Sequence, residues 1–276
     1  MNKNGVAKLL LLGLTIVVVL TSCISNTKNS SKSESFRFVQ ICDPQLGFSD
    51  YARDVNSFKQ AVKQINAMKP DFVVICGDLV NTADDQSFAD FNKIKSGLRM
   101  PCYCASGNHD IGNQPTPESL QYYRNVIGKD YFSFEYKGAW FVFVNTQLWK
   151  EPLQGESEKH DTWFRETLKV ASEKGGPIFV VGHYPLFIKE PDEADEYMNL
   201  PVEKRRELLD LFEQYNVVAT LGGHTHRLIL NDYKGIQLVN GEPVGRSFDE
   251  HPLGFRVWRV QDNSPPKHRF VPLEDL

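Results

Sequence analysis

The chain has 276 residues, of which 31 are Lys or Arg and 35 are Asp or Glu, so its formal net charge at pH 7 is −4. Proteins that bind nucleic acid usually have an excess or a cluster of basic residues, which this sequence lacks, and we exclude a nucleic-acid partner. Residues 36–276 are enough for one large domain with a substantial core, and we see no internal repeat or second domain boundary in them.

The N-terminal segment has the pattern of an export signal. Lys3 and Lys8 precede an uncharged apolar run at residues 9–20. This run is shorter than the roughly 20 residues that a membrane-spanning helix needs. A short positive segment followed by a short apolar run is typical of a signal that directs export.

The apolar run ends in the sequence LTSC at residues 20–23, which resembles the processing box of bacterial lipoproteins. We therefore expect residues 1–22 to be a lipoprotein signal peptide and Cys23 to carry a lipid anchor. The polar residues 23–35 are expected to be a flexible tether, and the domain would face the periplasm or the cell surface. The alternative is an ordinary cleaved signal in which Cys23 is incidental.

The first part of the domain alternates strands with helices. Apolar runs predict strands at 36–42, 71–76 and 101–106. Apolar residues from Val55 to Met68 recur at helical spacing, and a weaker helix is predicted at about 85–96. This order favours a sheet with parallel strands and helices on its faces.

The second part adds antiparallel strands, because aromatic runs on either side of Lys137-Gly138 predict a hairpin. The other predicted elements are a helix around 163–170, strands at 177–183 and from 216, a helix at 205–215, a hairpin at 227–240 and a terminal strand at 254–260. Buried free thiols are expected at Cys42, Cys76, Cys102 and Cys104, since a core of this size does not need a disulfide framework.

Five predicted strands end in segments that carry possible metal ligands. These segments are Asp43-Pro44-Gln45, Gly77-Asp78, Gly107-Asn108-His109-Asp110, Gly182-His183 and Gly223-His224-Thr225-His226. Open α/β sheets bind ligands at the carboxyl ends of their strands, so these side chains can converge on one site. Asp43 and Gln45, like His224 and His226, are two residues apart and would face the same way from an extended backbone. Each segment alone is weak evidence, because Asp and Gly also suit ordinary turns.

In this order, the five segments resemble the calcineurin-like metallophosphoesterase family from residue 36 to about residue 260. The resemblance implies an α/β fold of four layers, αββα, in which two mixed sheets lie between helices. It also implies two metal ions, and mixed nitrogen and oxygen ligands suit Mn, Fe or Zn. The implied reaction is hydrolysis of a phosphate ester by a hydroxide held between the metals, without a covalent enzyme intermediate.

The same resemblance gives each ligand a role. Asp78 would bridge the metals, and the other ligands would be Asp43, Gln45 and His226 at the first metal and Asn108, His183 and His224 at the second. Asn108 would also contact the substrate, and His109 would be the general acid that protonates the leaving group. Arg227 is either a phosphate contact or an ordinary surface arginine.

Two differences between this sequence and the usual family pattern indicate which branch of the family it resembles. Gln45 stands where the family usually has a histidine, and its amide oxygen is expected to hold the first metal less tightly. The chain also lacks the Gly-Asp-x-x-Asp-Arg pattern of the eukaryotic Ser/Thr phosphatase branch. The segments DPQLG, GHYPLF, EPDEADEYMNLP and GGHTHR instead resemble the CPPED1-type subgroup.

The surroundings of the site are open to two interpretations. The acidic run at residues 190–196 is either a solvated loop, which we favour, or a flap over the site that would disfavour strongly anionic substrates. Tyr184, Tyr197 and Trp149 either line the mouth of the site or belong to the core, where such aromatic residues are more often found.

The leading hypothesis is an exported, lipid-anchored and monomeric phosphomonoesterase, in the manner of a protein Ser/Thr phosphatase. A phosphodiesterase that acts on nucleotides or lipid head groups is the alternative, because the same metal chemistry supports it. A non-catalytic surface lipoprotein is a third hypothesis, against which all the expected ligands are present in the sequence.

Overall fold

A computed structural model describes residues 1, 35–262 and 264–274. Apart from Met1 and Ser35, the predicted signal peptide and tether, with Cys23, lie outside the described residues. The helices are α1 (Tyr51–Met68), α2 (Asp85–Lys95), α3 (Asn108–Ile111), α4 (Pro117–Val126), α5 (Gln147–Lys150), α6 (Glu156–Lys174) and α7 (Val202–Gln214). The strands are β1 (Phe36–Ile41), β2 (Phe72–Cys76), β3 (Cys102–Ala105), β4 (Phe132–Tyr136), β5 (Ala139–Phe143), β6 (Ile178–Val181), β7 (Val217–Gly222), β8 (Ile229–Tyr233), β9 (Ile236–Asn240), β10 (Gly254–Val260) and β11 (Lys267–Pro272).

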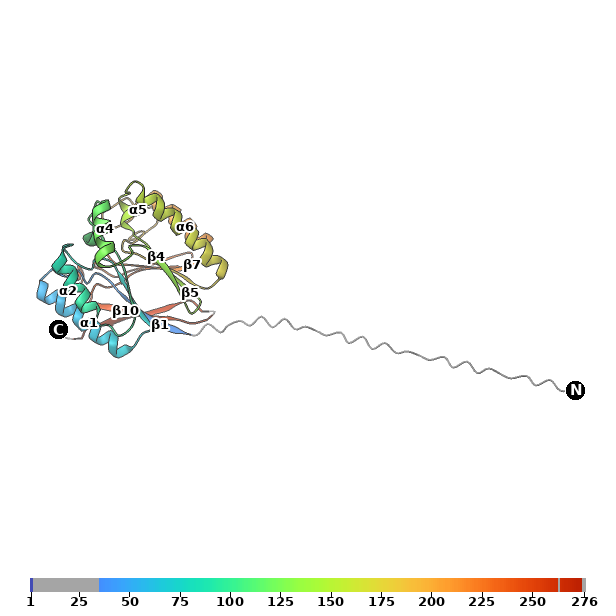
Figure 1. Cartoon of the computed structure of the whole chain (residues 1–276), viewed down its shortest axis with the longest axis horizontal. Coiled ribbons are helices and arrows are strands. Elements are labelled where there is room, and N and C mark those ends of the chain that lie inside the picture. The colour runs from blue at the N-terminus through green and yellow to red at the C-terminus, as the bar shows by residue number, and fades with distance from the viewer. Residues whose placement is uncertain (2–34, 263, 275–276) are drawn as a thin grey trace. The chain divides into compact units, whose positions relative to one another are not determined.

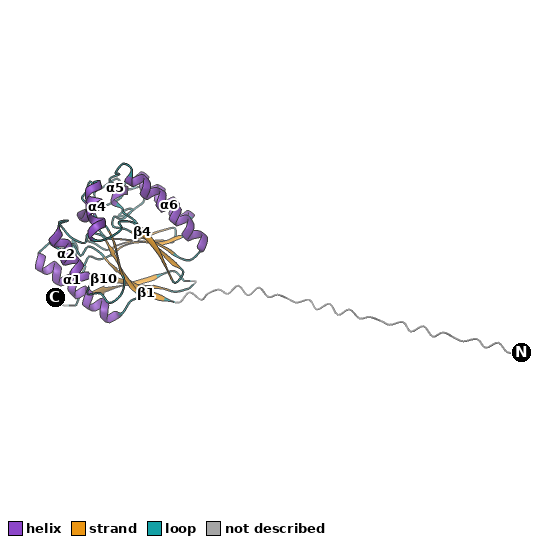
Figure 2. Cartoon of the chain, viewed as in Figure 1, coloured by secondary structure: helices purple, strands orange, loops and turns teal. Residues whose placement is uncertain are grey.

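The strands form two mixed sheets. The first has the order β11-β10-β1-β2-β3, in which β1, β2 and β3 are parallel and β10 and β11 are antiparallel. The second has the order β4-β5-β6-β7-β9-β8, with a parallel centre and an antiparallel strand at each edge. Figures 1 and 2 show both sheets between helices, so the predicted fold class is confirmed.

Aromatic side chains fill the space between the two sheets. Phe38 stacks on Phe72 at 5.3 Å between ring centroids, and Phe141 of the other sheet meets the edge of Phe38 at 5.0 Å. All three rings are buried. Full burial of each such side chain contributes about 1.5–3 kcal/mol, so this layer holds the sheets together.

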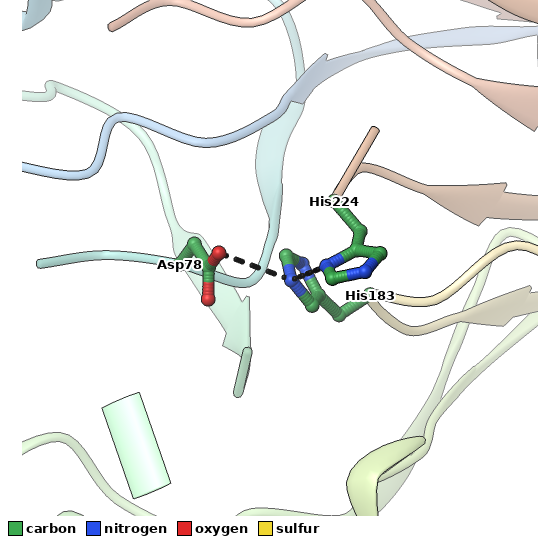
Figure 3. A group of neighbouring side chains, drawn as sticks. All are labelled: Asp78, His183 and His224. Carbon is green, nitrogen blue, oxygen red and sulfur yellow. Dashed lines mark hydrogen bonds and ion pairs between the residues drawn. The ribbon is translucent and has the colours of Figure 1, made fainter. Parts of the chain in front are cut away.

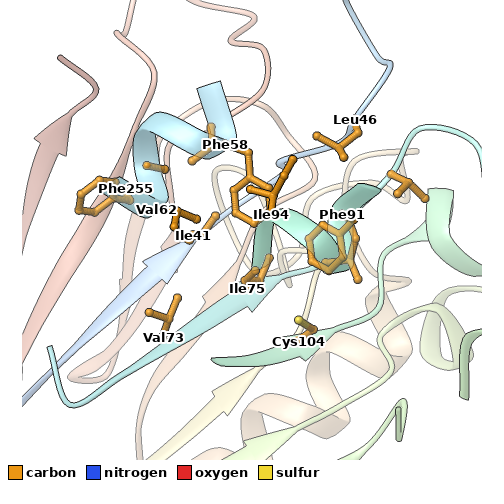
Figure 4. Close-up of a cluster of buried hydrophobic side chains, with 14 of the residues drawn as sticks. Ile41, Leu46, Phe58, Val62, Val73, Ile75, Phe91, Ile94, Cys104 and Phe255 are labelled. Carbon is orange, nitrogen blue, oxygen red and sulfur yellow. The ribbon is translucent and has the colours of Figure 1, made fainter. Parts of the chain in front are cut away.

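The outer faces of the sheets are covered by helices. On the first sheet, Phe58 of α1 and Phe91 of α2 pack above Ile41 and Ile75, as Figure 4 shows. On the second sheet, α6 and α7 contribute apolar residues such as Phe164 to a separate core cluster. These two clusters and the aromatic layer give the four-layer arrangement.

Most predicted elements agree with the structure within a few residues, but one prediction at the C-terminus was wrong. The strand predicted at residues 254–260 is present as β10, yet it is not terminal, because β11 pairs with it in antiparallel register. The sequence of β11, KHRFVP, has no continuous apolar run, since this edge strand is largely solvent-exposed. The four described cysteines are free, as predicted, and three are buried, but Cys102 is only partly buried. No helix in the described part of the chain is both long and apolar enough to span a membrane.

Candidate metal centre

Five of the predicted ligands come together in two groups that share one carboxylate. Asp78, His183 and His224 form the first group, and Asp43, Asp78 and His226 form the second. Within each group the candidate ligand atoms lie within 4.8 Å of one another, and all the residues are buried. Figure 3 shows the His183 ring between Asp78 and His224. The segments that follow β1, β2, β6 and β7 therefore meet at one place.

The backbone at these ligands is not in the extended form that we expected. The φ angles are 48° at Asp43, 32° at Gln45, 48° at Asp78, 70° at His224 and 52° at His226. The explanation that alternation in an extended segment directs each pair of side chains was therefore wrong. Nine non-glycine residues have positive φ in the described part of the chain, and five of them belong to this site. Such positions cost about 1–2 kcal/mol each, so surrounding contacts must hold them.

Two glycines allow the turns to approach the ligands. Gly77 has a φ of 81°, and a Cβ atom there would lie 2.6 Å from Nδ1 of His183. A Cβ atom at Gly107 would overlap the carboxylate and backbone nitrogen of Asp78. A larger residue at either position would displace a ligand, which explains the glycine in each of these two segments.

Asp78 and His183 form a buried ion pair at the centre of the site. Oδ2 of Asp78 lies 3.2 Å from Nε2 of His183. Burial lowers the pKa of His183, but the charge of Asp78, its hydrogen bond and the charge of Asp43 together raise that pKa to about 9. Burial would raise the pKa of Asp78, yet the charge and the hydrogen bond of His183, with the charges of nearby histidines, together lower it well below its usual range. Burial and then the charge of His183 lower the pKa of His224 to about 3.

Two buried oxygen atoms of the predicted ligands have no hydrogen-bond partner. Oδ1 of Asp43 accepts a hydrogen bond from the backbone N–H of His224 at 2.9 Å, but Oδ2 of Asp43 and Oε1 of Gln45 have none. Burial accordingly raises the pKa of Asp43. A buried polar atom without a partner is unfavourable, and a cation bound at these oxygens would satisfy both. With imidazole nitrogens nearby and no thiolate in either group, the residues present fit divalent metal ions of the Mn, Fe and Zn type.

Helix α3 carries Asn108 and His109. Oδ1 of Asn108 lies 3.1 Å from Nε2 of His183, so the predicted amide ligand is beside the first group. The backbone N–H of His109 donates to Oδ1 of Asp78 at 3.0 Å, while the His109 ring places Nδ1 3.0 Å from the carbonyl oxygen of Asn81. His109 thus lies next to the shared carboxylate but belongs to neither ligand group.

Asp110, the last residue of the Gly-Asn-His-Asp segment, connects two of the turns. Its carboxylate is buried and accepts hydrogen bonds from the backbone N–H of Leu79 at 2.9 Å and of Gly107 at 2.8 Å. Burial and the charge of Asp78 raise the pKa of Asp110. Asp110 therefore fixes the turn that carries Asp78 against the turn that carries Asn108.

An aromatic cluster that sequence reasoning missed lies beside His226. The rings of Phe48 and Phe248 are 5.0 Å and 4.7 Å from the His226 ring, and the Arg246 guanidinium lies 5.6 Å from each phenylalanine ring. The carbonyl oxygen of Arg246 is 2.6 Å from Nδ1 of His226. A signal that could have found these residues is Gly245-Arg246, which lies in the polar segment after β9, although farther from its strand than the ligand segments are from theirs.

Arg227 has no comparable contact. Its side chain is exposed, and its backbone N–H donates to Oγ1 of Thr225 at 3.4 Å. The structure therefore does not bring Arg227 into the ligand groups, and its role as a phosphate contact stays a prediction.

The acidic run at residues 190–196 is mostly exposed, as the favoured interpretation of a solvated loop expects, but the loop that carries it reaches the site through the next residue. Directly after the run, the Tyr197 hydroxyl accepts a hydrogen bond from Nδ2 of Asn108 at 3.1 Å, and its ring is 5.1 Å from that of His224. Tyr184 is buried with its ring 3.9 Å from His224. Trp149 belongs to the core, where aromatic residues in such runs are usually found. Its Nε1 donates a hydrogen bond to Asp161.

Comparison with known proteins agrees with this geometry. Residues 36–228 match the family model described as calcineurin-like phosphoesterase. The serine/threonine-protein phosphatase CPPED1 of Danio rerio is 33% identical over 269 residues, which cover 88% of this chain and 87% of that protein. The 3',5'-cyclic adenosine monophosphate phosphodiesterase CpdA of Haemophilus influenzae is 26% identical over 218 residues, which cover 74% of each.

Among solved structures, a dimetal phosphatase from Danio rerio has a similar fold, with a TM-score of 0.65, 15% identity and coverage of 87% of this chain and 99% of that one. The family match spans most of the described domain and contains the ligand segments from Asp43 to His226. The protein therefore belongs to the calcineurin-like phosphoesterase family, whose members depend on two metal ions, and it is a hydrolase of phosphate esters.

Proposed function

We propose that the protein is a phosphomonoesterase that acts on phosphorylated side chains or similar monoesters. The observation that carries this proposal is the shared carboxylate of Asp78, which belongs to both ligand groups. One metal would be held by Asp43, Gln45, Asp78 and His226, and the other by Asp78, Asn108, His183 and His224. When bound, such a pair lowers the pKa of a water molecule and stabilises the charge of a phosphoryl group during displacement.

His109 would complete the reaction by protonating the leaving oxygen. Its Nδ1 faces the carbonyl oxygen of Asn81, which is an acceptor only, so Nδ1 carries a hydrogen and Nε2 is left to face the substrate. As imidazolium, His109 would give the Nε2 proton to the alkoxide as the P–O bond breaks. Asn108 would hold its ligand oxygen toward the metal and contact the phosphoryl group, and Arg227 remains a candidate for a further phosphate contact.

The direct test is a substrate panel on the purified domain. Protein supplied with Mn²⁺, Fe²⁺, Zn²⁺, Co²⁺ or Mg²⁺ is given p-nitrophenyl phosphate, a phosphoserine peptide and bis(p-nitrophenyl) phosphate, with metal content measured alongside. We expect turnover of the two monoesters with about two metal ions per chain. Metal binding without turnover of any ester would contradict an enzymatic function and favour the non-catalytic lipoprotein.

A phosphodiesterase is the second candidate function. It is favoured by the likeness to CpdA of Haemophilus influenzae, a phosphodiesterase whose matched region covers 74% of this chain. Faster turnover of bis(p-nitrophenyl) phosphate or a cyclic nucleotide than of any monoester would select this alternative. The substrate panel therefore separates the two hydrolase functions.

Gln45 provides a test of the first metal site. Gln45→His replaces an amide oxygen with an imidazole nitrogen, a stronger ligand for Mn, Fe or Zn. Since changes around ligands alter metal affinity by about 10–100-fold, we expect the variant to retain the first metal at least about tenfold more tightly. Dialysis against graded chelator with metal analysis measures this, and unchanged retention would show that Gln45 is not a ligand.

We also propose that Cys23 anchors the protein to a membrane of an exporting bacterium, with the domain as a monomer outside the cytoplasm. The support is the LTSC box at the end of the apolar run. Cys23→Ser is expected to move the protein from the membrane fraction to the soluble fraction, because acylation needs the thiol. A Cys102→Ser variant, which keeps Cys23, is the control for the loss of a thiol. Unchanged fractionation of Cys23→Ser would remove the lipoprotein proposal.

A further inference from the structure

Tyr197 lies at the mouth of the metal centre, at the end of a loop that runs from Pro185 to Pro201 between β6 and α7. The Tyr197 side chain is 52% exposed, yet its hydroxyl accepts a hydrogen bond from Nδ2 of Asn108. Its carbonyl oxygen is 3.2 Å from Nε2 of His224. One residue of this loop therefore touches two of the predicted ligands from the solvent side.

The loop is held in place by a buried arginine. Arg205 of α7 is fully buried, and its guanidinium donates to the carbonyl oxygens of Pro191 at 2.6 Å, Glu193 at 3.0 Å and Leu200 at 2.8 Å. Lys150 of α5 donates to the carbonyl oxygens of Glu196 and Asn199. These bonds fix the loop from both flanks of Tyr197, so the tyrosine is presented by a rigid frame.

The acidic side chains of the loop build the same frame and do not face the metals. The Glu193 carboxylate accepts hydrogen bonds from the backbone N–H of Ile188 and Lys189 and from the amide of Asn199. Asp192 pairs with Arg206 at 2.8 Å, outside the site. The acidic run thus positions a neutral tyrosine at the site, and these carboxylates are engaged away from an anionic substrate.

The Tyr197 hydroxyl has an unused hydrogen. It accepts a bond from Asn108, and no acceptor for its own proton is present among the described residues. A tyrosine hydroxyl keeps its proton at neutral pH and can donate it. Nδ2 of Asn108 is held also by Oδ1 of Asn113 at 2.9 Å, so the amide orientation of Asn108 does not depend on Tyr197 alone.

We propose that Tyr197 is a substrate-binding residue whose hydroxyl donates to a non-bridging phosphoryl oxygen, and that this bond makes the enzyme prefer phosphomonoesters to phosphodiesters. The inference rests on the phosphomonoesterase function proposed above. A monoester has three non-bridging oxygens and a diester has only two, so a monoester offers one more charged acceptor. In a diester, the third of these oxygens is bonded to a second organic group. This esterified oxygen is a poor acceptor for the Tyr197 hydroxyl. A site built to form a hydrogen bond disfavours an analogue that cannot form it.

The test compares p-nitrophenyl phosphate with bis(p-nitrophenyl) phosphate on the Mn²⁺-loaded protein. Tyr197→Phe keeps the ring and removes the hydroxyl. Because a hydrogen bond to a charged group is lost, we expect kcat/KM for the monoester to fall about tenfold and that for the diester to change less than about twofold. Metal content is expected to stay the same, because Tyr197 is not a ligand.

Asn113→Ala is the matched control, because it removes the other acceptor of Asn108 and leaves Tyr197 intact. This variant is expected to change kcat/KM for the monoester and for the diester by the same factor. The inference would be overturned if Tyr197→Phe lowered kcat/KM equally for both esters. It would also be overturned if Asn113→Ala lowered kcat/KM for the monoester alone.

Titration of the Mn²⁺-loaded protein with inorganic phosphate is a readout that needs no turnover. Affinity is expected to fall about tenfold in Tyr197→Phe. A wild-type protein that hydrolyses neither ester would contradict the proposed function, and unchanged phosphate affinity in Tyr197→Phe would contradict the role of Tyr197. The two failures are therefore distinguishable.

Discussion

Asp78→Asn is expected to reduce kcat by at least about 1000-fold, because the loss of a shared anionic ligand removes several kcal/mol of charge stabilisation. Asparagine has nearly the same shape and keeps an acceptor for the backbone N–H of His109, so the turn after β2 is expected to persist. Metal content is expected to fall from about two ions per chain to one or fewer, since both ligand groups use Asp78.

The control for this variant is Asp210→Asn, which removes the same charge from an exposed position on α7. It is expected to match the wild type in metal content and rate. Full metal content and normal turnover in Asp78→Asn would refute the central role of the shared carboxylate. A variant that loses one metal and keeps full activity would show that a single ion is sufficient.

His109→Ala is expected to lower kcat by about 100- to 1000-fold on esters with poor leaving groups, which is the usual contribution of a general acid. The loss is expected to be much smaller with p-nitrophenyl phosphate, because p-nitrophenolate leaves without protonation. Metal content is expected to stay at the wild-type level, since His109 belongs to neither ligand group. The measurement compares β-glycerophosphate with p-nitrophenyl phosphate, alongside metal analysis.

His251→Ala is a suitable control, because His251 is an exposed histidine of the segment between β9 and β10. An equal loss on both esters in His109→Ala would mean that His109 does not protonate the leaving group. Loss of metal would show instead that the ring supports the metal centre.

The residues at the site were predictable because they follow buried strands, and buried strands are easy to recognise. Apolar runs located β1, β2, β6 and β7, and the polar residues directly after them include all the members of the two ligand groups. Periodicity says nothing of the backbone angles in a turn, and the left-handed conformations at Asp43 and His226 were missed for that reason.

Features that depend on contacts distant in the sequence were not predictable. Tyr197 is 89 residues from Asn108, and only the loop held by Arg205 brings the two together. The cluster of Phe48, Phe248 and Arg246 likewise joins two segments that lie far apart in the chain. Strand β11 was missed because an exposed edge strand needs few apolar residues.

The left-handed backbone at five site residues has an evolutionary consequence. Glycine adopts positive φ without the steric penalty that a side chain adds, so glycine at Asp43 or Gln45, each of which has a buried oxygen without a partner, would relieve local strain while removing a predicted ligand. A descendant of this protein released from selection for metal binding would gain stability by such changes. Substitution by glycine at these positions would therefore be an early sign that a relative has lost catalysis while keeping the fold.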